Sequence, residues 1–311
     1  MIEVVGLTKL YGNKKAIDTI DFNVDEGEIV GLLGLNGAGK STILKVLASY
    51  LSPTSGTVQI GGNRLGEESD EIRKICGYLP DRPPLYDEMT VESYLKFVCR
   101  VKGVPSSLIQ TKVDLVMAST NLNEVSDQLL SQISHGFRQR VGIAQAIAHE
   151  PKVIILDEPI KGLDPVQIIE MRDLILSLKG KYTVILSSHI LSEMTKTCDR
   201  ILIIDKGRLV AEGTEQHLMN NLGSHMLIKA VFRGSVQGFS EKLSALDGVD
   251  KVDFVDNSGV ISLSIEAQRD VRGQLAELVV NAGFELLELQ KADSDLESLF
   301  IKIVNQEGNY A

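Results

Sequence analysis

Long apolar segments are missing from this sequence. Its longest apolar runs, such as residues 153–156 and 201–204, have the length of a strand, whereas a membrane-spanning helix needs about 20 residues. The amino terminus also lacks the basic, apolar and small-residue segments that together make a secretion signal. The sequence therefore predicts a chain that reaches a membrane only through a partner protein.

Cysteine and dense positive charge are scarce as well. The sequence has 3 cysteines without metal-ligand spacing, and an odd number of unrelated cysteines is typical of free thiols in a reducing compartment. Acidic residues number 42 against 32 basic ones, and no run of Lys or Arg is dense enough to follow a phosphate backbone. These absences predict a cytoplasmic protein and argue against nucleic acid as a partner.

The chain is long enough for two domains. Its 311 residues, 43% of them hydrophobic, allow one large and one smaller domain, each with its own core. In the larger one, continuous apolar runs at 153–156, 183–186 and 201–204 are typical of strands buried on both faces of a parallel sheet. Helical stretches alternate with these runs, so the predicted core is α/β.

Two subdomains and a second domain are predicted around this core. Alternating apolar residues near the amino terminus predict an antiparallel β subdomain, and helical periodicity predicts a helical subdomain over about residues 85–150. A boundary at Gly223 separates the first domain, residues 1–222, from the second, residues 223–311. There the order strand, helix, two strands, helix, strand predicts a small ferredoxin-like α+β domain with an accessory role. The last amphipathic stretch, which we expect to support dimerisation or regulation, contains Leu296, Leu299, Phe300 and Ile303.

A glycine-rich segment in the first domain matches the pattern G-x-x-x-x-G-K-[ST]. It lies between a strand pattern and a helical pattern, which favours a phosphate-binding loop over an ordinary glycine-rich turn. Its glycines let consecutive backbone N–H groups converge on phosphate oxygens at the positive end of the following helix. We expect Lys40 to reach the β- and γ-phosphates of ATP and Ser41 to ligate Mg²⁺. The residues of the loop and the first residue after it are Gly34, Leu35, Asn36, Gly37, Ala38, Gly39, Lys40, Ser41 and Thr42.

Two acidic residues and a histidine follow later strands. Asp157 and Glu158 come directly after the apolar run 153–156, and parallel sheets display functional groups at the carboxyl ends of their strands. Asp157 suits the Mg²⁺ shell through a water molecule, and Glu158 suits a base that polarises the water attacking the γ-phosphate. His189 follows another apolar run and is expected to contact the γ-phosphate. The alternatives are that Asp157 and Glu158 only end a strand and that His189 is an ordinary turn residue. The phosphate loop upstream makes both less favoured.

A further segment carries a family resemblance. Residues 133–140 look like the signature loop of ATP-binding-cassette proteins, and with the motifs above they resemble the ATP-binding subunits of ABC transporters over residues 1 to about 220. The residues themselves indicate that Ser134 and Gly136 form a second anion site at a helix start. The resemblance implies a P-loop NTPase of the ABC type in which this site grips the γ-phosphate of ATP bound by another copy. A homodimer, or a heterodimer with a related ATPase, would then enclose two nucleotides.

The resemblance also assigns residues outside these motifs. It implies that Tyr11 stacks on the adenine and that Asp164 belongs to a loop that crosses to the second subunit. It places Asp81 where the family commonly has a glutamine that serves as metal ligand and coupling switch, and a carboxylate also binds Mg²⁺. Other departures from common family residues are His135, Phe137, Ile160 and Lys161.

These expectations combine into a transporter motor. ATP would close a dimer, and the surface around residues 82–91, with Tyr86 and Met89 as candidate contacts, would push on a separate transmembrane permease. The resemblance to exporter and gliding-motility-type subunits implies export, from a place on the inner face of the cell membrane. A soluble ABC-type ATPase acting on a ribosome or nucleic-acid complex is the alternative, and it predicts tandem cassettes or a long coiled coil between the phosphate loop and the acidic strand, together with basic surfaces. A sensing scaffold without turnover is a third, against which Glu158 argues.

Overall fold

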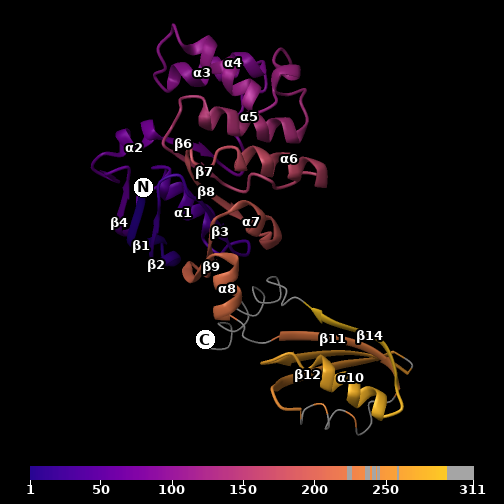
Figure 1. The fold of residues 1–311 in the computed structure, drawn as a ribbon. Helices are drawn as coiled ribbons and strands as arrows, with labels where there is room; N and C mark the ends of the chain where they lie inside the picture. Colours follow the sequence, from indigo (N-terminus) through magenta and orange to yellow (C-terminus); the bar gives the residue numbers. More distant parts are fainter. Residues whose placement is uncertain (223–225, 235–238, 240–242, 244–245, 258, 293–311) are drawn as a thin grey trace. The chain divides into compact units, whose positions relative to one another are not determined.

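The chain folds into two compact units. The computed structural model describes residues 1–222, 226–234, 239, 243, 246–257 and 259–292 (Figure 1). The first unit is Met1–Glu215 and the second is Gln216–Ala311. Helix α8 (Glu215–Leu222) begins at this division, and the boundary expected after residue 222 coincides with the end of the same helix. Among the described residues, no helix combines the length and apolar character needed to cross a membrane.

A six-stranded sheet forms the centre of the first unit. Its strand order is β10-β9-β3-β8-β7-β6, and every neighbouring pair is parallel except β9 with β10. Every residue of β3, β7 and β8 is buried, as their apolar runs predict. The α/β core is thus confirmed. The strands are β3 (Ile29–Leu33), β6 (Cys76–Leu79), β7 (Val153–Leu156), β8 (Thr183–Ser188), β9 (Arg200–Asp205) and β10 (Arg208–Gly213).

An antiparallel sheet of four strands, in the order β2-β1-β4-β5, makes up the predicted β subdomain. Its buried side chains share one hydrophobic core with helix α1 and with strands of the central sheet. This shared core fixes the subdomain against the start of α1, where the phosphate loop ends. The elements are β1 (Ile2–Tyr11), β2 (Lys14–Val24), β4 (Ser55–Ile60), β5 (Asn63–Arg64), α1 (Lys40–Leu47) and α2 (Ser69–Ile75).

The predicted helical subdomain is confirmed as a group of helices on one side of the first unit (Figure 1). Helix α3 begins after Thr90, whose hydroxyl accepts the Ser93 N–H at 3.2 Å and so caps the helix. The helices of the group are α3 (Val91–Val101), α4 (Ile109–Ser119), the 3₁₀ turn η1 (Asn123–Val125) and α5 (His135–Ile147). Two more helices of this unit, α6 (Pro165–Leu176) and α7 (Leu191–Thr197), follow β7 and β8.

The second unit contains an antiparallel sheet with the strand order β12-β13-β11-β14. With helix α10, this order agrees with the predicted ferredoxin-like α+β domain. The Phe232, Phe239 and Phe284 rings pack in its core, with centroids 5.2–5.7 Å apart. The helix expected over 239–246 and the apolar residues Leu296, Leu299, Phe300 and Ile303 lie largely or wholly outside the described residues. The elements are β11 (Met226–Arg233), β12 (Val249–Asn257), β13 (Val260–Ala267), α10 (Arg272–Asn281) and β14 (Glu285–Ala292).

Candidate active site

The glycine-rich loop leaves the end of β3 and enters α1. Gly37 and Gly39 have φ angles of +85° and +112°, a left-handed backbone that side chains rarely adopt. A Cβ atom on Gly34 would lie 2.4 Å from the carbonyl oxygen of Ile204, which is near the end of β9, the strand beside β3. Glycine is therefore required at these positions by conformation and by space. The loop has the backbone shape that a phosphate cradle needs.

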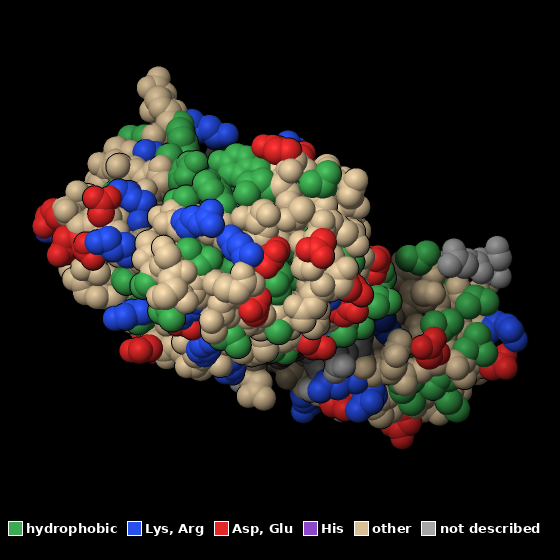
Figure 2. All heavy atoms as spheres, turned by 90° about the horizontal axis from the view of Figure 1, so that it is seen from above, with side chains coloured by type: hydrophobic (Ala, Val, Ile, Leu, Met, Phe, Trp, Pro, Cys, Tyr) green, Lys and Arg blue, Asp and Glu red, His purple; other side chains and the backbone are tan. Residues whose placement is uncertain are grey.

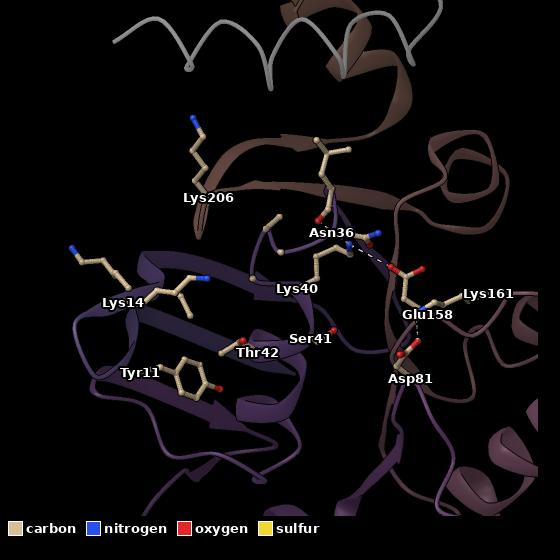
Figure 3. A pocket seen from close by; sticks show the side chains of 16 residues that line it. Tyr11, Lys14, Asn36, Lys40, Ser41, Thr42, Asp81, Glu158, Lys161 and Lys206 are labelled. Carbon is tan, nitrogen blue, oxygen red and sulfur yellow. Dashed lines mark hydrogen bonds and ion pairs between the residues drawn. The ribbon is translucent and has the colours of Figure 1, made fainter. Parts of the chain in front are cut away.

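Lys40 lies in the floor of this loop with only 5% of its surface exposed. Its ammonium donates to the Gly34 carbonyl at 2.7 Å and lies 3.3 Å from Oε1 of Glu158. Figure 3 shows the two side chains pointing toward one another across the pocket. A buried ammonium is costly unless it is paired, and here a carboxylate and a carbonyl offset that cost.

Asp157 follows β7 and faces the start of α1. Its Oδ1 accepts the Ser41 hydroxyl at 3.0 Å and the Ser187 hydroxyl at 2.8 Å. Burial raises the pKa of Asp157 above its ordinary value, although the hydrogen bonds from Ser187 and Ser41 oppose the shift. The structure thus joins two residues of the predicted metal set, Ser41 and Asp157, by a direct hydrogen bond.

Glu158 is held from three sides at the next position. Its N–H donates to the Ser187 hydroxyl at 2.9 Å, and its Oε2 lies 3.0 Å from Nδ1 of His189. Its other carboxylate oxygen, Oε1, faces Lys40. The backbone of Glu158 is left-handed, with φ +51°, an unusual conformation for a residue with a side chain and one that is common at functional sites. The three predicted catalytic residues, Lys40, Glu158 and His189, are therefore brought together.

Strand order explains this grouping. Strands β3, β8 and β7 are consecutive neighbours in the parallel sheet, and β6 follows β7. The residues after these strands therefore meet at one edge, where α/β sheets bind ligands. Lys40 comes after β3, His189 after β8, Glu158 after β7 and Asp81 after β6.

A pocket of about 630 Å³ opens over the loop. Tyr11 stands at its rim with 49% of its surface exposed, so its ring is accessible to a ligand. Four lysines that the sequence did not single out as ligands complete the positive wall, namely Lys14, Lys15, Lys161 and Lys206. Of the predicted residues, Tyr11, Leu35, Asn36, Gly37, Ala38, Gly39, Lys40, Ser41, Thr42, Asp81 and Glu158 line this pocket.

Four predicted nucleotide-binding residues do not line that pocket, namely Gly34, Ser134, Gly136 and Asp164, and the first of them lies at the start of the phosphate loop itself. Ser134 caps α5, its hydroxyl accepting the Phe137 N–H at 3.3 Å, and Gly136 lies so close to Gln167 that a Cβ would be 2.7 Å from its side-chain oxygen. Ser134 and Gly136 line a second cavity of about 200 Å³. Asp164 caps α6 and accepts two backbone N–H groups at 2.9 and 3.0 Å. One copy of the chain therefore keeps its two predicted anion sites in separate cavities.

Comparison with known proteins agrees with this geometry. Residues 17–161 match the domain family described as ABC transporter. The chain is 32% identical over 306 residues to the bacitracin transport ATP-binding protein BcrA of Bacillus licheniformis, covering 98% of this chain and 97% of that protein. The chain belongs to the ABC transporter family. It is an ATP-binding subunit and ATPase of that family, with the ABC-type fold.

Two further proteins extend the comparison. The daunorubicin/doxorubicin resistance ATP-binding protein DrrA of Streptomyces peucetius is 30% identical over 303 residues, covering 97% of this chain and 92% of that protein. A dimeric bacterial ABC transporter cassette of known structure superimposes with a TM-score of 0.63 at 25% identity, covering 69% of this chain and 98% of that one. The likeness to these ABC proteins spans the nucleotide-binding unit and, in the sequence comparisons, nearly the whole chain.

Asp81 is placed differently from the other acidic residues of this ABC ATPase. Its Oδ1 lies 2.8 Å from the ammonium of Lys161, as Figure 3 shows, rather than on Ser41 or Asp157. Over the described part of the chain, no group of three or more His, Cys, Asp and Glu residues is arranged to hold a metal ion. The pairing arises because β6 and β7 are parallel neighbours, so the segments that follow them meet. No local pattern in the sequence indicates this partner, because the pair depends on which strands are neighbours in the sheet.

Proposed function

We propose that the chain is the ATP-hydrolysing motor subunit of an ABC exporter. The observation that carries the proposal is the grouping of Lys40, Glu158 and His189 beside the nucleotide pocket, where the Lys40 ammonium and the His189 ring each contact the Glu158 carboxylate. Phosphoryl transfer needs positioned charge and a positioned water more than covalent help from the protein. This arrangement supplies an ammonium for the phosphates and a carboxylate for the water.

The proposed reaction uses groups that are already aimed at one another. The N–H groups of the loop hold the phosphates, and Lys40 exchanges the Gly34 carbonyl for phosphate oxygens, which are stronger acceptors for an ammonium. Glu158 then polarises the attacking water as general base. His189 holds Oε2 of Glu158 and so orients the carboxylate next to the γ-phosphate.

Ser41 and Asp157 fit a magnesium ion. Hydroxyl and carboxylate oxygens are the ligands that Mg²⁺ prefers. The Ser41 hydroxyl oxygen and Oδ1 of Asp157 are 3.0 Å apart at the start of α1. When bound there, Mg²⁺ would neutralise charge on the phosphates. Burial disfavours the charged form of Asp157, so a cation beside it would offset that cost. Asp81 completes the metal set that the sequence predicts, but its carboxylate is already paired with Lys161.

Two copies of the chain would complete the sites. Ser134 and Gly136 line a cavity of their own, and in the proposed dimer this cavity faces the γ-phosphate held by the partner's loop. The solved relative that superimposes on the nucleotide-binding unit is dimeric, which supports this arrangement. Asp164 would lie in the loop that crosses to the partner. A monomer should then bind ATP but hydrolyse it slowly, and a related ATPase could replace the second copy.

The mechanical partner would be a separate membrane-spanning permease. BcrA is named for bacitracin transport and DrrA for daunorubicin and doxorubicin resistance, which supports export of a compound toxic to the cell. The segment 82–91 is the proposed contact surface, since the Tyr86 side chain is 48% exposed there. Its ring packs edge-on against Phe97, with the two ring centroids 5.6 Å apart. Met89 in the same segment is half-buried. The chain would then work at the inner face of the membrane.

Hydrolysis is tested by replacing Glu158 with glutamine. Glu158→Gln should lower kcat for ATP by about 100-fold or more, because it removes the base, while ATP affinity stays within about twofold. The measurement is phosphate release together with titration of a fluorescent ATP analogue. Unchanged hydrolysis by the variant would disprove the assigned base.

The partner is tested by affinity purification from solubilised membranes. Recovery of a polytopic membrane protein supports the transporter role, whereas recovery of ribosomes or nucleic acid would support the alternative of a soluble ABC-type ATPase. Figure 2 shows acidic and basic side chains interspersed over the face that it draws, instead of one continuous basic area on that face. Mixed charge of this kind does not favour contact with a phosphate backbone.

A further inference from the structure

Lys161 makes a contact at the nucleotide pocket that the proposed chemistry does not use. It lies in the loop after Glu158 and pairs with Asp81 at 2.8 Å, although the two residues are far apart in the sequence. The Lys161 and Asp81 side chains are 54% and 37% exposed, and both line the pocket. The pair therefore stands where an incoming nucleotide would meet it.

The charges around Lys161 favour its protonated form. The pKa of Lys161 is raised by its hydrogen bond to Asp81 and by the nearby negative charges of Asp81, Glu158 and Asp157. In turn, the charges of Asp81 and Glu158 add to the burial that raises the pKa of Asp157. Lys161 thus adds a positive charge close to three carboxylates at the edge of the sheet and pairs directly with Asp81, whereas Lys40 pairs with Glu158.

The backbone of Lys161 makes a second contact, in another direction. Its carbonyl lies 3.0 Å from Nε2 of His135, which must be the donor because a carbonyl oxygen only accepts. Gly162 leaves room for that ring, because a Cβ atom there would lie 3.3 Å from Nε2 of His135. Its φ of +74° is also a backbone conformation that favours glycine. His135 is the first residue of α5 and follows the cap residue Ser134.

The segment that contains Asp81 is also tied to α5 further along. Arg138 of α5 pairs with Asp87 at 2.7 Å. Residues 81–87 are therefore linked to the first turns of α5 at both ends, once through Lys161 and once directly. Loss of the first link leaves the second in place, so the segment should keep its fold.

We propose that Lys161 is a positioning residue that holds Asp81 with its side chain and the first turn of α5 with its carbonyl. One residue then connects three segments, the end of β6, the loop after Glu158 and the start of the helix capped by Ser134. Asp81 acts as the counter-ion of Lys161 and not as a metal ligand in its own right. This inference rests on the nucleotide site proposed above, and it concerns the geometry of that site.

Substitutions at the pair test the proposal. Lys161→Met and Asp81→Asn should each lower kcat for ATP hydrolysis by about tenfold, since misplacement of a catalytic site by an ångström is that costly or more. The affinity for a fluorescent ATP analogue, and the Mg²⁺ concentration that half-saturates its binding, should stay within about twofold. The double variant should be no slower than either single variant because both remove the same contact. Lys161→Arg should restore most of the rate.

Lys179→Met is the matched control. Lys179 pairs with Asp199 away from the pocket, and the two side chains are 52% and 33% exposed, close to the values for Lys161 and Asp81. This variant should hydrolyse ATP at the rate of the unaltered chain. Three results would overturn the proposal, namely an unchanged kcat for Lys161→Met, additive losses in the double variant, or a large rise in the Mg²⁺ requirement of Asp81→Asn alone. Activity retained by Glu158→Gln would instead count against the proposed function.

Discussion

The two cavities of the nucleotide-binding unit differ in how their polar groups are satisfied. At the cavity over the phosphate loop, the buried Lys40 ammonium pairs with Glu158, and the Ser41 hydroxyl donates a hydrogen bond to Asp157. In the cavity beside α5, the Ser134 hydroxyl is used by its own helix and Gly136 packs against Gln167. The first cavity is assembled by long-range contacts, and we propose that it binds ATP in a single copy of the chain. The second lies at a helix start, where Arg140 pairs with Glu170 at 2.6 Å, and we propose that it receives the phosphate of a nucleotide bound by a partner copy.

The strongest test of this contrast is to change the backbone of the first cavity. Gly34→Ala adds a Cβ atom 2.4 Å from the Ile204 carbonyl oxygen, so the loop must move. We expect ATP affinity to fall by about 100-fold, at the upper end of the effect of overpacking by 1–3 kcal/mol. Titration with a fluorescent ATP analogue measures it. Gly273→Ala is the control, because a Cβ there meets nothing within 4 Å. Equal affinities for the two variants would contradict the tight loop.

A smaller effect, on a different quantity, is expected at the second cavity. Ser134→Ala should leave ATP binding by the isolated chain unchanged but lower hydrolysis roughly tenfold, because it removes a hydrogen bond to a charged phosphate held by the partner. Loss of the helix cap costs about 1 kcal/mol of stability. Thr90→Ala is the control, because it removes the cap of α3 in the same way. This variant should hydrolyse ATP at the rate of the unaltered chain. If both variants lost hydrolysis equally, the second cavity would have only a structural role.

The smallest effect concerns the stability of the folded chain, which Asp157 beside the first cavity makes dependent on pH. Burial raises the pKa of Asp157 in the folded chain above the ordinary 3.8, so the folded chain binds the proton more tightly than the unfolded chain. Stability is then lost as pH rises through the window above 3.8 and stays lower at neutral pH. Asp157→Asn should therefore raise Tm at pH 7.5 by about 2 °C.

Thermal unfolding at two pH values checks this prediction. The gain should shrink as pH falls through the folded pKa of Asp157 and vanish below the ordinary pKa of 3.8, because the protonated carboxyl group carries no charge that costs stability. The asparagine oxygen still accepts the Ser41 and Ser187 hydroxyls, so the hydrogen bonds are not the difference between the variants. A variant that is less stable at both pH values would show that the carboxylate stabilises the fold.

Much of the first cavity could be predicted from the sequence because its parts are local. The glycine-rich loop is one contiguous segment, and Asp157 and Glu158 follow directly on a buried strand. The four lysines of the pocket wall were not predicted, since surface lysines are common and only their position around the loop marks them. The second domain was predicted as a small ferredoxin-like α+β domain from the order of its strands and helices along the chain. Its accessory role and the role of residues 293–311, which lie outside the described residues, stay predictions.

The sequence by itself determined the phosphate loop, the acidic strand end, the α/β core and the membership of the ABC family, because each depends on neighbouring residues or a short periodicity. Only the tertiary structure decided which charges meet. The parallel pairing of β6 with β7 sets Asp81 beside Lys161, and the order β3-β8-β7 sets Glu158 between Lys40 and His189. Strand order is a long-range property of the packed core, so these ion pairs have no local signature in the chain.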